Sequence, residues 1–254
     1  MLDQALNFVL RGGLPAFALS AIVLLLAARA RGPAAAPRRA RAVAAGLALG
    51  YLVGQGLRFG WPELAELASW PPRLAREGRL RMFWLVGATL LLGLAEAGGR
   101  ARAATLAGRV VLAFAVPAWF LLNVLERSEA GEIAARVGGC GAALLAVWIA
   151  LDRLAARRAG PTVPIAIWMS ASAASIGLIF AANAVVAELA GCLAAAVAPP
   201  LLLSLRRDDL LLARGAAGVA VVVLACLLMQ GVLLTSPGMP ILAGLLLLFA
   251  PAAA

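Results

Sequence analysis

Residues 161–205 read PTVPIAIWMSASAASIGLIFAANAVVAELAGCLAAAVAPPLLLSL, and Glu188 is the one formal charge in this stretch. An α-helix rises about 1.5 Å per residue, and the hydrocarbon core of a bilayer is about 30 Å thick. A single helix of this length would therefore be far too long for one crossing. The stretch predicts two membrane-spanning helices, over 161–182 and 185–205, joined by a tight turn near Asn183.

The rest of the chain has the same apolar character. Of its 254 residues, 64% are hydrophobic and 13% are charged, whereas a soluble domain is about half apolar and about a quarter charged. Lipid must therefore cover part of the surface. Further apolar runs predict spans over 13–30, 42–60, 82–98, 105–125, 137–152, 210–234 and 240–254, the last of which is short for a full crossing. We expect one all-α domain over residues 1–254, a polytopic transmembrane helix bundle of eight to nine spanning helices with short loops.

The arginines predict the orientation of the bundle. All 22 basic residues are Arg, and the formal net charge is +10. If the helices alternate, one side of the membrane receives Arg29, Arg31, Arg38, Arg39, Arg41, Arg100, Arg102, Arg153, Arg157, Arg158, Arg206 and Arg207. The positive-inside rule makes that side cytoplasmic. We therefore expect the protein in the cell (plasma or inner) membrane with its N-terminus outside and, with nine spans, its C-terminus inside. Because these arginines occupy short segments between apolar runs, they indicate lipid-headgroup contacts, and we expect no nucleic-acid partner.

Residues 61–81 do not follow this pattern, because they should lie outside and yet contain Arg73, Arg76, Arg79 and Arg81. Trp61, Leu64 and Leu67 recur at helical spacing. This segment therefore predicts a short amphipathic helix in the membrane interface, held by Arg to lipid phosphates. Its interface anchors would be Trp61 and Trp70, with Trp84 just beyond it. The alternative is a lid over an outward-facing cavity.

Small residues mark two faces for close helix packing. Gly46, Gly50 and Gly54 recur every four residues in the second predicted span, so they lie on one face and allow a neighbouring backbone to approach. They predict a packing seam, with a dimer interface as the alternative. Ser170, Ser172 and Ser175 predict interhelical hydrogen bonds in the sixth span.

A group of polar residues falls at the predicted outer ends of the helices. Its members are Gln55, Arg58, Asn123, Glu126, Asn183, Glu188 and Gln230. The natural ion pair within this group joins Arg58 to Glu126 or to Glu188. Our hypothesis is that the group forms a substrate or partner site; the alternative is that each member caps a helix or reaches the headgroups.

The other ionisable residues inside the predicted spans lie near the cytoplasmic face. Glu96 stands four residues before Arg100, the spacing of a local helical ion pair, and Arg109 and Asp152 lie at the same level. The midplane then carries no ionisable group. This argues against a proton-driven pump that uses a central carboxylate.

Several chemistries find no support in the sequence. There is no His, and the three cysteines show no metal-ligand spacing. No catalytic motif is present, so we expect no metal site and no cofactor, and we lean against an enzyme. The leading hypothesis is a small-molecule transporter or permease-like protein with an outward-facing polar cavity. The alternative is a non-catalytic membrane subunit or scaffold that binds a protein partner or lipid through its Gly-rich faces. The expected partners are thus the lipid bilayer with a small-molecule substrate or a membrane protein; a lipid-handling enzyme ranks third.

Overall fold

The computed structural model describes residues 6–29, 35–61, 78–99, 102–121, 129–157, 160–206, 215–234 and 238–253. Regular structure within these ranges is helical throughout. In chain order the helices are the π-helical turn η1 (Val9–Gly13), α2 (Leu14–Ala28), α3 (Ala35–Phe59), α5 (Gly78–Ala97), α6 (Arg102–Phe120), α8 (Ala130–Arg157), α9 (Thr162–Phe180), α10 (Ala184–Ser204), α11 (Ala216–Leu233) and α12 (Ile241–Ala253). The predicted all-α bundle is confirmed.

Seven of the described helices are long and apolar enough to cross a membrane. They are the helix Leu6–Ala28, which combines η1 with α2, and α3, α6, α8, α9, α10 and α11. The chain is therefore a multi-pass membrane protein. The two remaining helices are α5, with 20 residues, and α12, with 13. Because they are not among the seven, the expected total of eight or nine crossings stays a prediction.

Three helices extend beyond the apolar spans predicted for them. α3 begins at Ala35 and not at 42, α5 begins at Gly78 and not at 82, and α8 extends beyond 137–152 at both ends. The added turns carry charged residues such as Arg38, Arg39 and Glu132. An apolar run marks only the part of a helix that lies in hydrocarbon, whereas the helix itself continues into the polar zone, where long charged side chains reach water.

The expected turn near Asn183 is confirmed. Ala182 adopts a φ of +56°, and its N–H donates to the Ile179 carbonyl while the Asn183 N–H donates to the Leu178 carbonyl, each at 3.0 Å. This is the Schellman pattern that ends a helix with a left-handed residue. The Asn183 side chain then accepts the Val186 N–H at 3.2 Å as the N-cap of α10. Two adjacent caps thus reverse the chain with no extended loop.

The interfacial prediction for residues 61–81 falls mostly on residues 62–77, which lie outside the described ranges, as does Trp70. The described part corrects one assignment. Arg81 belongs to α5 and is buried, and its Nη1 donates to the carbonyls of Trp119 and Phe120 at 3.0 and 2.6 Å. It therefore satisfies the last carbonyls of α6 and does not bind a lipid phosphate.

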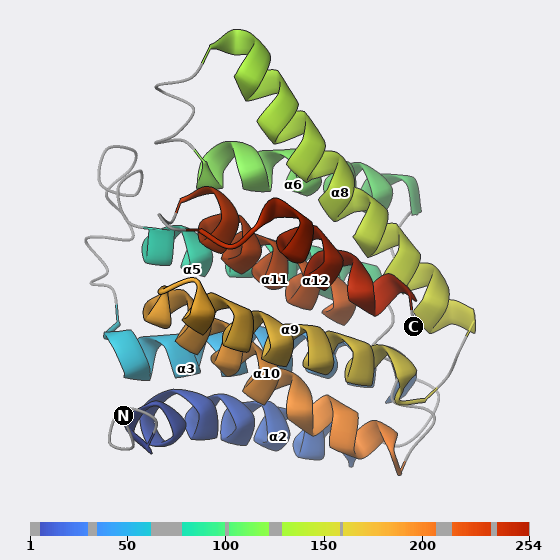
Figure 1. The fold of residues 1–254 in the computed structure, drawn as a ribbon. Helices are drawn as coiled ribbons and strands as arrows, with labels where there is room; N and C mark the ends of the chain where they lie inside the picture. Colours follow the sequence, from blue (N-terminus) through green and yellow to red (C-terminus); the bar gives the residue numbers. More distant parts are fainter. Residues whose placement is uncertain are drawn as a thin grey trace.

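Successive helices run in opposite directions across the bundle, with α8 strongly tilted at one edge (Figure 1). We call the end where α3 ends and α10 begins the Arg58 end, and the opposite end, where α6 begins and α8 ends, the Arg109 end. Fifteen of the 18 residues of α11 are buried, because α11 packs against α3, α5, α6, α8, α9, α10 and α12. A helix that is apolar on all faces apart from Gln230 forms the centre of a solid core in this position.

The α2–α3 interface is built on the glycine face of α3. A Cβ atom at Gly50 would lie 2.6 Å from the Ala16 carbonyl oxygen, and one at Gly54 would lie 2.7 Å from that of Gly12. At Gly46 the nearest atom would be the Ser20 carbonyl oxygen, at 3.2 Å. All three glycines are buried within the chain. They therefore join α3 to its own α2 and η1, and they do not offer a face to a second chain.

Candidate functional site

The polar residues that the structure brings together at the Arg58 end lie between α3 and α10. Arg58 Nη2 donates to Glu188 Oε1 at 3.0 Å, and Arg58 Nε lies 2.8 Å from Glu188 Oε2. The Nε–H is not directed at Oε2, so this second contact is a close charge contact and not a hydrogen bond. The two side chains are 22% and 21% exposed. Most of each side chain is thus buried, unlike in an ordinary surface ion pair.

The face of α3 that carries Arg58 continues inward with polar residues. Gln55 and Tyr51 lie three and seven residues before Arg58, so the three residues share one face of α3. Both Gln55 and Tyr51 are buried. The Tyr51 hydroxyl has no hydrogen-bond partner among the described residues. Cys192 on α10 packs against this part of α3, because a Cβ atom at Gly54 would lie 3.3 Å from the Cys192 sulfur. A polar track therefore leads from the ion pair toward the bilayer centre.

The structure gives positions for two other members of the predicted polar group. Asn183 is used as the N-cap of α10, and Gln230 lies in the last turn of α11. Asn123 and Glu126 lie outside the described residues. Of the predicted interface anchors, Trp84 is exposed on α5, and Trp61 is exposed with its ring 6.1 Å from that of Phe83.

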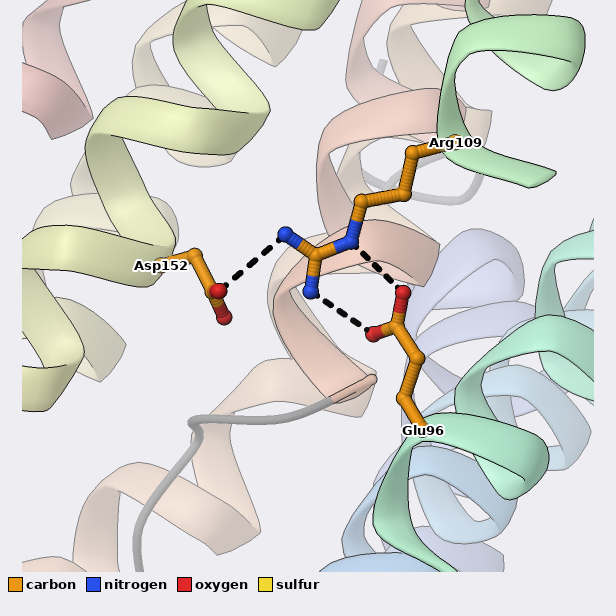
Figure 2. A network of polar contacts seen from close by, with 3 residues as sticks. All are labelled: Glu96, Arg109 and Asp152. Carbon is orange, nitrogen blue, oxygen red and sulfur yellow. Dashed lines mark hydrogen bonds and ion pairs between the residues drawn. The ribbon is translucent and has the colours of Figure 1, made fainter. Parts of the chain in front are cut away.

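A second charged cluster, at the Arg109 end, joins three helices (Figure 2). Arg109 on α6 donates from Nε and Nη2 to the two carboxylate oxygens of Glu96 on α5, at 2.6 and 3.0 Å. Its Nη1 donates to Asp152 Oδ2 on α8 at 3.1 Å. The guanidinium also lies over the Trp148 ring, 5.6 Å from its centroid. The side chains of Arg109 and Glu96 are only 12% and 4% exposed.

The sequence located the members of this triad at one level but missed their pairing. Arg109, a partner that the sequence did not indicate, engages both oxygens of Glu96. The expected partner, Arg100, lies outside the described residues, so that pairing stays a prediction. The sequence does place three charged residues at one level of three helices, and such charges are more stable in contact than when each is alone in hydrocarbon. This indicates that they meet. Sequence separation alone could not select the partners.

A cavity among the described residues lies away from Arg58 and differs in character from the predicted polar one. A cavity of about 130 Å³ lies between α8, α11 and α12 and has an apolar lining. It opens toward the lipid-facing surface at Gly139, Ile241 and Leu245, which are exposed. This apolar cavity is therefore not the outward-facing polar cavity that we expected around Arg58.

No known protein family, no curated protein and no solved structure shows significant similarity to the chain. Among the described residues, no group of three or more His, Cys, Asp or Glu side chains is placed to hold a metal ion. The functional argument therefore rests on the two charged clusters, the polar track and the apolar cavity of this multi-pass membrane protein.

The Arg109 cluster predicts an unequal response to loss of charge. Arg109→Gln leaves the buried Glu96 without its counter-charge, and breaking such a buried pair costs about 3–5 kcal/mol. Arg136→Gln is the matched control, because Arg136 pairs with Glu132 on the surface of α8, where the side chains are 38% and 56% exposed and a pair contributes at most about 1 kcal/mol. Unfolding free energies in one detergent measure both. Equal losses would contradict the structural role of the triad.

Proposed function

We propose that the chain is a small-molecule transporter of the permease type, with its solute site between α3 and α10 at the Arg58 end. The supporting observation is the Arg58–Glu188 pair, which joins helices 130 residues apart in sequence and stands at the entrance of the polar track. Ionisable groups within membrane helices are costly and are retained mostly for function or for pairing.

The contrast between the two charged clusters supports the assignment of roles. The Arg109 triad joins three helices, and Arg109 holds Glu96 through two hydrogen bonds. The Arg109 and Glu96 side chains are 12% and 4% exposed, and their bidentate contact has the properties of a fixed brace, whereas Asp152 is 33% exposed. The Arg58–Glu188 pair has a single hydrogen bond and a fifth of each side chain exposed. A solute at the surface can therefore compete for the single hydrogen bond of this pair more readily than for the bidentate contact between Arg109 and Glu96.

Transport also requires a second arrangement of the helices. The core around α11 is closely packed inward of the track, so the present arrangement corresponds to a state that is closed toward the Arg109 end. Alternating access would open that end by moving one group of helices against the other around the fixed site. The pairs α2–α3 and α9–α10, which pack most extensively, are the natural rigid units.

Native mass spectrometry of the protein released gently from its own membrane tests this proposal. We expect a monomer that carries a discrete non-lipid mass, and we expect this mass to be lost in Glu188→Gln because Arg58 loses its partner. Glu132→Gln is the matched control, since it removes a carboxylate from an exposed ion pair within α8. No retained small mass in the wild-type protein, or equal retention in Glu188→Gln, would overturn the proposal.

The apolar cavity favours a second candidate, a non-catalytic membrane subunit that binds lipid. Its volume of about 130 Å³ is close to that of an engineered apolar cavity of about 150 Å³ that stays dry and binds a small apolar molecule. Because it opens beside Gly139 toward the bilayer, the class of occupant is a lipid acyl chain. The glycine face of α3 does not contribute to this alternative, since it is buried within the chain.

Adjacent glycines on α8 provide a direct test of the lipid candidate. A Cβ atom would meet nothing within 4 Å at Gly138 or at Gly139, but only Gly139 lines the cavity. Gly139→Leu should fill the cavity and reduce photolabelling of α12 by a phospholipid with a diazirine in its acyl chain. Gly138→Leu should leave the labelling unchanged. Identical labelling in both variants, quantified by peptide mass spectrometry, would reject an acyl-chain site.

A further inference from the structure

We propose that the Arg58–Glu188 pair recognises a zwitterion, that is, a ligand carrying one ammonium group and one carboxylate or phosphate group. In the bound state the anionic group pairs with Arg58 and the ammonium group with Glu188, so that the ligand replaces the direct contact between the two side chains. This inference rests on the proposed function, because it names the substrate class of the same site.

The first argument is charge balance. Separating a partly buried ion pair leaves two unpaired charges in a medium of low dielectric, which is strongly unfavourable. A ligand with a single charge restores only one of the two pairings and leaves the other side chain uncompensated. A zwitterion restores both, and each of its contacts is a charge-assisted hydrogen bond. The pair therefore selects for ligands of zero net charge that carry both signs.

The second argument concerns the surroundings of the pair. Residues 42–57 of α3 carry no formal charge, and α11 carries none. Within α10, Glu188 is the only charged residue. A ligand with a net charge would find no counter-charge along the inward track. Its transfer into such a region would carry the full desolvation cost of that charge. The neutral track thus favours the same net-neutral class.

The third argument is the buried Tyr51 hydroxyl, which lies two helical turns inward of Arg58, about 10 Å at 1.5 Å per residue. It has no hydrogen-bond partner among the described residues, and burial of an unsatisfied hydroxyl is unfavourable. Cys192 packs against Gly54, which lies between Tyr51 and Arg58 along α3. A polar ligand that moves inward from the pair would meet Gln55 and then this hydroxyl.

The same chemistry has two sources, a free solute such as an amino acid and the headgroup of an ethanolamine phospholipid. The test uses the full chain in nanodiscs of phosphatidylglycerol, which contains no amine. The unfolding temperature is measured during titration with a mixture of amino acids that have uncharged side chains. Two matched mixtures contain the corresponding amines and the corresponding carboxylic acids. Glycerophosphoethanolamine in solution and nanodiscs of phosphatidylethanolamine form the lipid arm.

We expect saturable stabilisation by zwitterions only, with at least about tenfold weaker binding in Arg58→Gln and Glu188→Gln alike, since each loses one charged hydrogen bond. Glu132→Gln should bind as the wild type does. Equal stabilisation by amines alone or acids alone, or none by any zwitterion, would overturn the inference. The comparison of zwitterions with amines and with acids uses the wild-type protein, so it tests the inference even if a variant fails to fold.

The outcomes also separate this inference from the proposed function. A retained small ligand that carries a net charge would support transport and overturn the zwitterion class. Stabilisation confined to the ethanolamine headgroup would support the zwitterion class and contradict the transport of a free solute.

Discussion

Pairing of every charge inside the bundle is the constraint on which the rest of the structure depends. In lipid, an ionised group without a partner costs several kcal/mol, and no water is present to relieve it. The Arg109 triad meets this constraint by joining α5, α6 and α8 at one end. The Arg58–Glu188 pair meets it by joining α3 to α10 at the other end. Between them lies α11, which contributes apolar surface only apart from Gln230.

The helical fold could be predicted from sequence because its cause is local and strong. Long apolar runs must form helices in a bilayer, so residues 161–205 divided at Asn183 where the caps permit a reversal. The ends of the helices were harder to predict from the sequence, because the Arg-bearing turns of α3 and the ends of α8 are helical without being apolar. The role of Arg81 could not be predicted for a similar reason. The sequence does not distinguish a buried Arg that caps a neighbouring helix from an Arg that binds a phosphate.

The candidate site was only partly accessible to sequence reasoning. Alternation of the helices places Arg58 and Glu188 at one end of the bundle, and opposite charges at one level predict a pair. Nothing in the sequence reveals that Tyr51 is buried or that Cys192 of α10 packs against Gly54 of α3, because this depends on how the two helices are rotated about their axes. The apolar cavity is equally hidden, since it depends on how α8, α11 and α12 pack together.

The most direct test of the account is the accessibility of Cys192, which is buried beside the Arg58–Glu188 pair. A chain with Cys140→Ala and Cys226→Ala retains this thiol alone and can be treated in proteoliposomes with a membrane-impermeant methanethiosulfonate reagent. If the pair closes the entrance to the polar track, Glu188→Gln should accelerate labelling from the Arg58 side, and Glu132→Gln should not. Equal labelling rates in the two variants would contradict the account.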